Sequence, residues 1–231
     1  MENCPLVSAV IAVYNGEQFL AEALNSALAQ TYRPIEIIVV DDGSTDRSCA
    51  IAQAYAEVRY IYQSHHGLSV SRNIGIHAAR GEFIAFLDAD DLWTPNKLSI
   101  QLAYMREHPE LGYTGTRAQL FLESNVTAPT WLRENVLTKD HADLTPSALV
   151  IRRQVFEQIG YFDSHYGISN DLDWLSRALD GGVQKAIVPE MLLSKRLHTT
   201  NLSFHAQQTL QEMLQIARAS IERKHQGRCA A

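Results

Sequence analysis

Aspartates gather directly after two apolar segments of the chain. Asp41 and Asp42 follow the segment 35–40, and the run Asp-Ala-Asp-Asp at 88–91 follows the segment 83–87. Carboxylates brought together in this way raise one another's pKa unless a cation or hydrogen-bond donors neutralise them. Oxygen ligands of this kind suit Mg²⁺ or Mn²⁺, and Mg²⁺ is usually held by one or two carboxylates together with substrate phosphates. The aspartates therefore predict a divalent-cation site.

Alternating strands and helices are expected to place these aspartates at one edge of a sheet. Segments 6–13, 35–40 and 83–87 have the apolar character of buried strands, and 58–62 is a further expected strand. The segments between them have helical spacing. This alternation requires a parallel sheet with right-handed crossovers. Ligands of such sheets bind beyond the carboxyl ends of the strands. The expected fold class is α/β, a single Rossmann-like domain whose mostly parallel central sheet is flanked by helices.

Helix starts are expected at three cap residues. We expect Asn15 to cap a helix that runs to about residue 31, and Thr94 to cap a helix with Pro95 in its first turn. Ser203 is expected to cap a final helix that runs to about residue 225. Its apolar residues form one stripe of Leu210, Met213, Leu214, Ala217 and Ile221.

The pattern becomes less regular beyond Pro109. Residues 123–145, which include Trp131, are expected to form a long loop. The other expected elements are strands at 111–116, 120–122, 148–151, 183–188 and 192–197 and helices at 154–159 and 171–179.

Composition and charge exclude several classes of protein. The chain has 231 residues, of which 46% are hydrophobic and 20% are charged, as in an ordinary one-domain globular protein. A net charge of −6 matches a phosphate backbone poorly, so no nucleic-acid partner is expected. Three widely spaced cysteines fit neither a disulfide framework nor a zinc site. With no signal-peptide pattern and no long apolar run, we expect a cytoplasmic protein.

The motifs at the expected strand ends resemble those of the family 2 glycosyltransferases, which have the nucleotide-sugar-binding fold called the glycosyltransferase A type. A weaker match extends the resemblance to about residue 180. Letters that carry the resemblance are Val-Ile-Ala-Val-Tyr-Asn at 10–15, Ile-Val-Val-Asp-Asp-Gly-Ser-Thr-Asp at 38–46, Ser-Arg-Asn-Ile-Gly at 71–75, Phe-Leu-Asp-Ala-Asp-Asp at 86–91, Gly-Tyr-Phe-Asp at 160–163 and Asn-Asp-Leu-Asp at 170–173.

The resemblance implies one glycosyltransferase A-type domain at 1–202 and a C-terminal helix at 203–231. Its nucleotide-binding half would cover about 5–108, and its acceptor and catalytic half about 109–202. The implied activity is metal-dependent, inverting transfer of a sugar from a nucleotide-diphosphate sugar, with a UDP-sugar as the first choice. The implied acceptor is a hydroxyl of a carbohydrate or a lipid-linked sugar, in polysaccharide or glycoconjugate assembly.

The same resemblance assigns roles at the nucleotide. Asp42 would contact the nucleobase in a pocket lined by the first strand's end. Asp88 would contact the base or ribose, and Arg72 would lie near the nucleotide. The full set of implied nucleotide-binding residues is Ala12, Tyr14, Asn15, Asp42, Arg72 and Asp88.

Metal binding and catalysis are assigned in the same way. Asp90, the last residue of the D-x-D motif, is the leading ligand of the Mg²⁺ or Mn²⁺ ion, and His198 is a second candidate. Asp171 matches the aspartate that acts as general base, and Asp173 is the alternative. Relatives commonly have Glu at the position of Asn170, so this chain lacks one negative charge beside the implied base.

Two other functions and one location remain open from the sequence. Asn170 favours a nucleotide-sugar-binding partner without catalysis, and a nucleotidyltransferase would also bring carboxylates and Mg²⁺ to a phosphate, although it usually needs a Gly-rich basic loop. Basic residues late in the final helix complement the helix dipole, and they also allow peripheral contact with the inner face of a membrane. These residues are Arg218, Arg223, Lys224 and Arg228.

Overall fold

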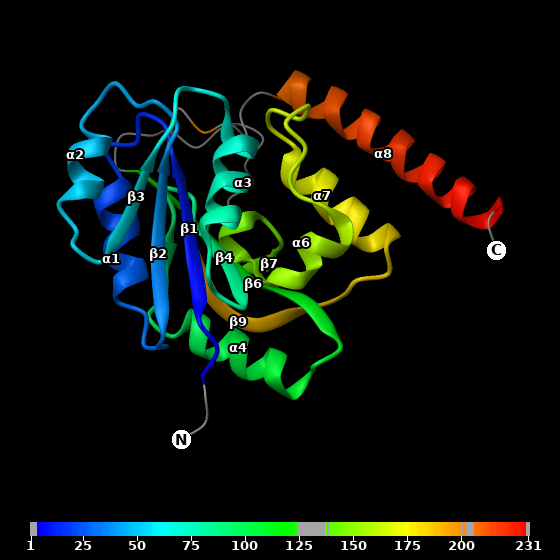
Figure 1. Cartoon of the computed structure of the whole chain (residues 1–231), viewed down its shortest axis with the longest axis horizontal. Helices are drawn as coiled ribbons and strands as arrows, with labels where there is room; N and C mark the ends of the chain where they lie inside the picture. The colour runs from blue at the N-terminus through cyan, green and yellow to red at the C-terminus, as the bar shows by residue number, and fades with distance from the viewer. Residues whose placement is uncertain (1–3, 124–136, 138, 200, 202–205, 230–231) are drawn as a thin grey trace.

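The computed structural model describes residues 4–123, 137, 139–199, 201 and 206–229. Within these residues, nine strands form one sheet that helices flank (Figure 1). The strands are β1 Val7–Val13, β2 Ile35–Asp41, β3 Val58–Tyr62, β4 Phe83–Phe86, β5 Leu92–Trp93, β6 Leu111–Leu122, β7 His141–Asp143, β8 Val150–Arg152 and β9 Gln184–Leu197. The helices are α1 Leu20–Leu28, α2 Ser48–Gln53, α3 Leu68–Ala78, α4 Lys97–Glu107, η1 Pro146–Ala148, α6 Arg153–Ile159, α7 Asn170–Asp180 and α8 Ala206–Cys229.

The first half of the chain builds a parallel sheet, as expected. The strand order is β3-β2-β1-β4-β8-β6-β9-β5, and β1 is paired in parallel with both β2 and β4. Val13 lies opposite Asp41 in the register, so the loops after β1 and β2 leave the sheet side by side. The expectation of an α/β fold with a mostly parallel central sheet is confirmed.

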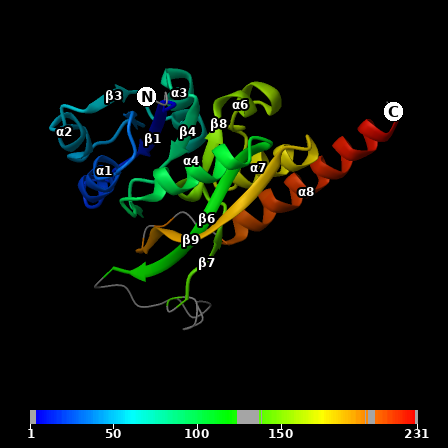
Figure 2. The same ribbon diagram turned by 90° about the horizontal axis from the view of Figure 1, so that it is seen from below.

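The second half adds antiparallel strands, and here several expected bounds are wrong. Two pairs of short strands merge into the long strands β6 and β9, which lie side by side (Figure 2). Register shifts between Gly115 and Arg117 mark irregularities in β6, and such bulges break the alternation that sequence reading relies on. The short strand β5 was not expected. Strand β7 lies within the expected loop 123–145, while Trp131 and most of that loop lie outside the described residues.

Two of the expected helix caps are wrong and the third lies outside the described residues. Asn15 has a φ of 50°, and its Oδ1 accepts a hydrogen bond from the Thr45 backbone N–H at 2.8 Å, so it joins two loops rather than capping α1. The Thr94 N–H donates to the Leu192 carbonyl at 3.0 Å, which extends the β5–β9 pairing and delays α4 to Lys97. Ser203 lies outside the described residues.

Alternate side chains of the central strands fill two hydrophobic clusters, one on each face of the sheet. Ile37 and Val39 of β2 belong to the cluster that α1 and α4 cover, and Ile38 and Val40 belong to the cluster beneath α3, α6 and α7. Trp174 of α7 is fully buried in the second cluster. Burial of α7 by Trp174 fixes the helix whose first turn carries Asp171.

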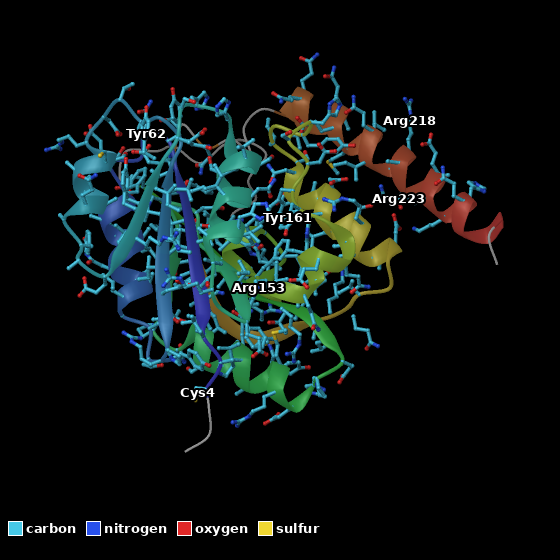
Figure 3. The ribbon with its side chains drawn as sticks, in the orientation of Figure 1. Cys4, Tyr62, Arg153, Tyr161, Arg218 and Arg223 are labelled. Atoms are coloured by element: carbon cyan, nitrogen blue, oxygen red, sulfur yellow. The ribbon has the colours of Figure 1, made fainter. Side chains whose placement is uncertain are left out.

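Helix α8 packs against α7 with a face other than its apolar stripe. Its apolar stripe points to solvent: Leu210 is 60% exposed and Ile221 is 57% exposed. The side that faces α7 is largely polar, and Arg223 lies on it while Arg218 lies on the outer side (Figure 3). The described residues include no helix with the length and apolar character that crossing a membrane requires.

Candidate functional site

The loop after β4 meets the end of β9 through a carboxylate–imidazole pair. The Oδ2 atom of Asp90 lies 2.8 Å from Nε2 of His198, and the Asn201 side-chain amide donates to the same oxygen at 3.3 Å. The ring of Phe19 lies against the His198 ring with centroids 4.8 Å apart. The two residues that sequence reading named for the metal are therefore together, although they are 108 positions apart in the chain.

Arg72 connects the D-x-D loop to the first turn of α7. Its side chain is buried, and its two terminal nitrogens donate to Oδ1 of Asp88 and to Oδ1 of Asn170, each at 2.8 Å. The guanidinium carbon lies 5.6 Å from the centre of the Phe162 ring. Asn170 is fully buried, and its side chain is uncharged. Arg72 thus pairs with one carboxylate and one neutral amide.

The two candidate bases have different environments. Asp173 is buried and forms an ion pair with Arg177 of the same helix, with a nitrogen–oxygen distance of 2.8 Å. Asp171 is half-buried, and its Oδ1 accepts the backbone N–H of Leu172 at 2.9 Å. Burial raises the pKa of Asp171, while the nearby charge of Arg72 opposes that rise. Asp171 is therefore the carboxylate that is not committed to an arginine.

Opposite charges balance the aspartate cluster after β4. Asp91 is buried, and burial together with the charges of Asp90 and Asp88 raises its pKa well above its usual value. Lys195 of β9 supplies a positive charge to this cluster, and its Nζ donates to Thr145 Oγ1 at 2.9 Å. Burial would lower the pKa of Lys195, but the surrounding aspartates hold it above its usual value. Lys195 therefore offsets only part of the negative charge of these aspartates.

Asp41, the last residue of β2, and Asp42, which follows it, contact different segments. Asp41 is fully buried and accepts hydrogen bonds from the Ser44 N–H and the Tyr60 hydroxyl, so it stabilises a turn rather than joining the cluster. Asp42 accepts the backbone N–H groups of His66 and Gly67, each at 2.9 Å.

A stacked pair of rings lies beside Asp42. Nδ1 of His65 lies 2.9 Å from Oδ2 of Asp42, and its ring stacks on that of Tyr14 with centroids 4.1 Å apart. Tyr14 is 50% exposed, and Ala12 is half-buried within β1. The residues that the resemblance assigns to the nucleobase are thus grouped at the ends of β1 and β2, together with His65, to which the resemblance assigns no role.

Sequence reading also missed Arg196, the central cation of this region. Its buried guanidinium forms ion pairs with Glu22 at 2.7 Å and with Glu123 at 2.5 Å, and its Nε donates to the Asp90 carbonyl at 3.1 Å. Arg196 in β9 and His198, one residue beyond the end of β9, are two positions apart, a spacing that places side chains of extended backbone on the same face. Both side chains lie against the Phe19 ring. This two-residue spacing from His198 was the sequence signal that could have identified Arg196.

The Asp90–His198 pair can contribute to a divalent-cation site but does not complete one. Within the described part of the chain, no group of three or more His, Cys, Asp or Glu side chains is arranged to hold a metal ion. Mg²⁺ and Mn²⁺ sites commonly take one or two protein ligands and complete their coordination with substrate phosphates and water. The donor set therefore fits a cation that is shared with a bound diphosphate.

Comparison with known proteins identifies the family. The model of the family described as glycosyl transferase family 2 matches residues 8–160. The chain belongs to glycosyl transferase family 2. An uncharacterized glycosyltransferase of Rickettsia typhi is 32% identical over 217 residues, which are 87% of this chain and 68% of that protein. One of Haemophilus influenzae is 29% identical over 223 residues, covering 88% and 69% of the two chains.

Solved structures share the fold of this family 2 chain. A mannosyltransferase of Pyrobaculum calidifontis, solved with GDP-Man and Mn²⁺, has a TM-score of 0.72 at 17% identity and covers 96% of this chain. Residues 1–349 of TarS from S. aureus, solved with UDP-GlcNAc, have a TM-score of 0.70 at 20% identity and cover 86%. This chain spans 65% and 60% of those two chains. At these identities the likeness shows the glycosyltransferase A-type fold.

Proposed function

We propose that this chain transfers a sugar from a nucleotide-diphosphate sugar to a hydroxyl acceptor, with inversion at the anomeric carbon. The observation that carries the proposal is the Asp90–His198 pair, which lies beside the Arg72–Asp88 pair and the half-buried Asp171. This reaction needs metal ligands, a cation near the diphosphate and a carboxylate that is free of an arginine ion pair, and these residues are candidates for the three roles. The relatives named above are glycosyltransferases, which supports the reaction class.

The nucleotide is proposed to bind at the ends of β1 and β2. Tyr14 and His65 offer a ring surface for the nucleobase, and Asp42 orients His65 and the following loop. Ala12 and Asn15 would line the same pocket. The two solved neighbours bind UDP-GlcNAc and GDP-Man, so the fold accepts more than one base. We favour a UDP-sugar as donor.

The diphosphate is proposed to lie between Arg72, Asp88 and Asp90. Arg72 is held rigidly by Asp88 and Asn170, so its charge is fixed before the substrate arrives. Asp90 and His198 would hold Mg²⁺ or Mn²⁺. A divalent cation bound there supplies Lewis-acid stabilisation of the departing diphosphate.

Asp171 is proposed as the general base. Its carboxylate would take the proton of the acceptor hydroxyl while that oxygen attacks the anomeric carbon and the bond to the diphosphate breaks. A single displacement of this kind inverts the anomeric configuration. Asp173 remains the alternative base, but it would have to leave Arg177 to act.

Thermal unfolding tests the donor site. The wild type and Asp90→Asn are heated with UDP, GDP, dTDP or CMP, each with Mn²⁺ or with EDTA. A ligand at about 100 times its Kd stabilises the native state by roughly 2.7 kcal/mol. We expect a Mn²⁺-dependent shift with one nucleotide that Asp90→Asn abolishes. A well-folded wild type that shifts with none of the nucleotides would contradict the proposal.

Paired variants of α7 test catalysis. Asp171→Asn is expected to reduce transfer by at least a factor of about 100 while nucleotide binding is kept. Asp173→Asn is expected to lower stability through loss of the Arg177 pair and to retain most of the transfer rate per folded molecule. If both variants bind the nucleotide as the wild type does and neither reduces transfer, the base assignment is wrong. A wild type that binds nucleotide sugars but transfers none supports the alternative of a binding partner, for which Asn170 is the motivating residue.

The acceptor and any membrane contact of α8 stay predictions. A carbohydrate or a lipid-linked sugar is the expected acceptor. Arg218 lies on the outer side of α8, whereas Arg223 and Lys224 form ion pairs with Asp180 of α7, so part of the basic charge named for membrane contact is already neutralised.

A further inference from the structure

A glutamate of α8, Glu212, accepts hydrogen bonds from the loop that precedes α7. Oε1 of Glu212 accepts the backbone N–H of Gly167 at 3.1 Å, and Oε2 accepts those of Ile168 at 3.1 Å and Ser169 at 2.7 Å. The side-chain amide of Gln208 donates to Oε1 at 2.9 Å. Three consecutive backbone donors therefore converge on one carboxylate from another part of the chain.

This carboxylate acts at the beginning of α7. Ser169 occupies the N-cap position of α7, and its side chain makes no capping hydrogen bond. Glu212 satisfies the N–H of Ser169 and places a negative charge at the positive end of the helix dipole. Burial would raise the pKa of Glu212, but the hydrogen bonds from Ser169, Gln208 and Ile168 hold it below its usual value. Glu212 is 7% exposed and therefore acts as a buried anion.

The bound loop is also fixed to the nucleotide side of the domain. The Tyr166 carbonyl accepts the hydroxyl of Ser69 from α3 at 3.1 Å, and Asn170 accepts Arg72 from the same helix. The Ser169 carbonyl accepts the N–H of Asp173 at 3.0 Å, which begins the helical hydrogen bonding of α7. The start of α7 is thus held between α3 on one side and Glu212 of α8 on the other.

We propose that Glu212 is a positioning residue for Asp171: α8 holds the first turn of α7 through this carboxylate and so fixes the base relative to the donor. The inference rests on the proposed function, since it assigns the base to Asp171. Misplacing a reacting group by about 1 Å can cost up to 100-fold in rate. A loss of Glu212 should therefore lower turnover far more than donor binding, because the proposed donor contacts lie on α3 and at the ends of β1, β2 and β4.

The α7–α8 interface contains a matched control at its other end. Asp180, near the C-terminus of α7, accepts hydrogen bonds from Ser220 at 2.9 Å and Arg223 at 2.8 Å, and its side chain is 6% exposed. Asp180→Asn makes the same change from carboxylate to amide between the same two helices. It leaves the three backbone donors at the start of α7 and their acceptor in place.

The test compares Glu212→Gln with Asp180→Asn in the full chain. Sugar transfer is measured as kcat and KM for the donor, nucleoside-diphosphate binding as Kd, and amide hydrogen exchange over residues 167–173. For Glu212→Gln we expect kcat to fall about tenfold, KM and Kd to change less than about twofold, and exchange to accelerate by about tenfold or more. For Asp180→Asn we expect unchanged kcat and unchanged exchange in this segment, whatever its loss of stability.

Three results would overturn the proposal: equal loss of kcat in the two variants, faster exchange in Glu212→Gln with unchanged kcat, or unchanged exchange over 167–173. If Glu212→Gln does not fold, Gln208→Ala replaces it, because that variant removes one donor to Glu212 and keeps the backbone bonds. It should lower kcat about threefold with KM unchanged, and an unchanged kcat would overturn the proposal. If the wild type transfers no sugar, the proposed function fails. The exchange comparison then decides whether Glu212 holds α7.

Discussion

Replacing Arg72 by methionine removes both its buried contacts and its charge, and two different measurements report on the two effects. Methionine fills much of the volume of the arginine stem but carries neither charge nor donors. The change leaves the side chain of Asn170, which is fully buried, without its guanidinium partner, and it removes the ion pair to Asp88. Stability and the ionisation of Asp171 should both change, each in a direction that the contacts determine.

The loss of stability can be worked out contact by contact. The hydrogen bond from a charged donor to buried Asn170 is worth about 1.5–3 kcal/mol. The Asp88 side chain is 33% exposed, so the solvent-screened ion pair adds no more than about 1 kcal/mol. Contact with the Phe162 ring adds about 0.5–1 kcal/mol, and burial of the methionine returns about 1 kcal/mol. We expect the free energy of unfolding to fall by about 1–4 kcal/mol.

The effect on catalysis has a definite sign. Burial raises the pKa of Asp171, the charges of Arg72 and Lys195 lower it, and the charge of Asp88 raises it. Removing Arg72 therefore raises the pKa further. Because the base acts when ionised, the acid limb of the pH dependence of kcat should move to higher pH in Arg72→Met. The assays are urea unfolding followed by fluorescence, and sugar transfer measured from about pH 4 to pH 9.

Arg177→Met is the matched control, since Arg177 pairs with Asp173 and leaves the contacts of Asp171 unchanged. It should reduce stability without moving the acid limb. An acid limb of Arg72→Met that stays in place or moves to lower pH would refute the electrostatic reasoning. A loss of unfolding free energy below about 0.5 kcal/mol would refute the account of the buried contacts.

Three further substitutions have expected outcomes. The Lys97 side chain is fully buried, and burial lowers its pKa well below 10.5. Because the unfolded chain then binds more protons than the folded one, the free energy of unfolding should rise with pH up to about 10.5. Lys97→Met should raise stability at pH 7 and flatten that pH dependence, and a destabilised variant would contradict this reasoning. Gly75→Ala places a Cβ 2.2 Å from Cγ1 of Val10, so the free energy of unfolding measured by chemical denaturation should fall by about 1–3 kcal/mol. Adding Val10→Ala should restore part of that stability, because it removes the clashing methyl group. A double variant with no recovery would contradict the steric cause. Trp174→Phe loses the hydrogen bond to the Gly160 carbonyl and leaves a gap in the core. Its denaturation midpoint should therefore drop by the equivalent of about 1–3 kcal/mol. An unchanged midpoint would contradict the claim that Trp174 stabilises the core.

The N-terminal half of the fold follows from local patterns. Buried parallel strands such as β1 and β2 read as continuous apolar runs, and an aspartate or asparagine after such a run lies at the carboxyl edge wherever the strand sits. The positions of Asp42, Asp88 and Asp90 near one edge could therefore be predicted. Helix starts were less predictable: Asn15 binds a loop 30 positions away, and a contact over that distance leaves no mark in the spacing of neighbouring residues.

The rest depended on contacts between distant segments. In the sequence, only the position in the motif favours Asp171 over Asp173. The difference in environment arises because Arg177 pairs with Asp173 while Arg72 approaches Asp171 from another helix. The apolar stripe of α8 lies in solvent, and the helix turns its polar side to α7, because Glu212 and Asp180 each find partners at that interface.

The sequence by itself determined the strand-end motifs, the family and the residue types available for chemistry, because these depend on patterns within a few residues. Only the tertiary structure decided which of those residues act together. Ion pairs and buried hydrogen bonds such as Asp90–His198, Arg72–Asn170 and Glu212–Ser169 join positions 43 to 108 residues apart. Their energies depend on distance and burial, which exist only once the chain has folded.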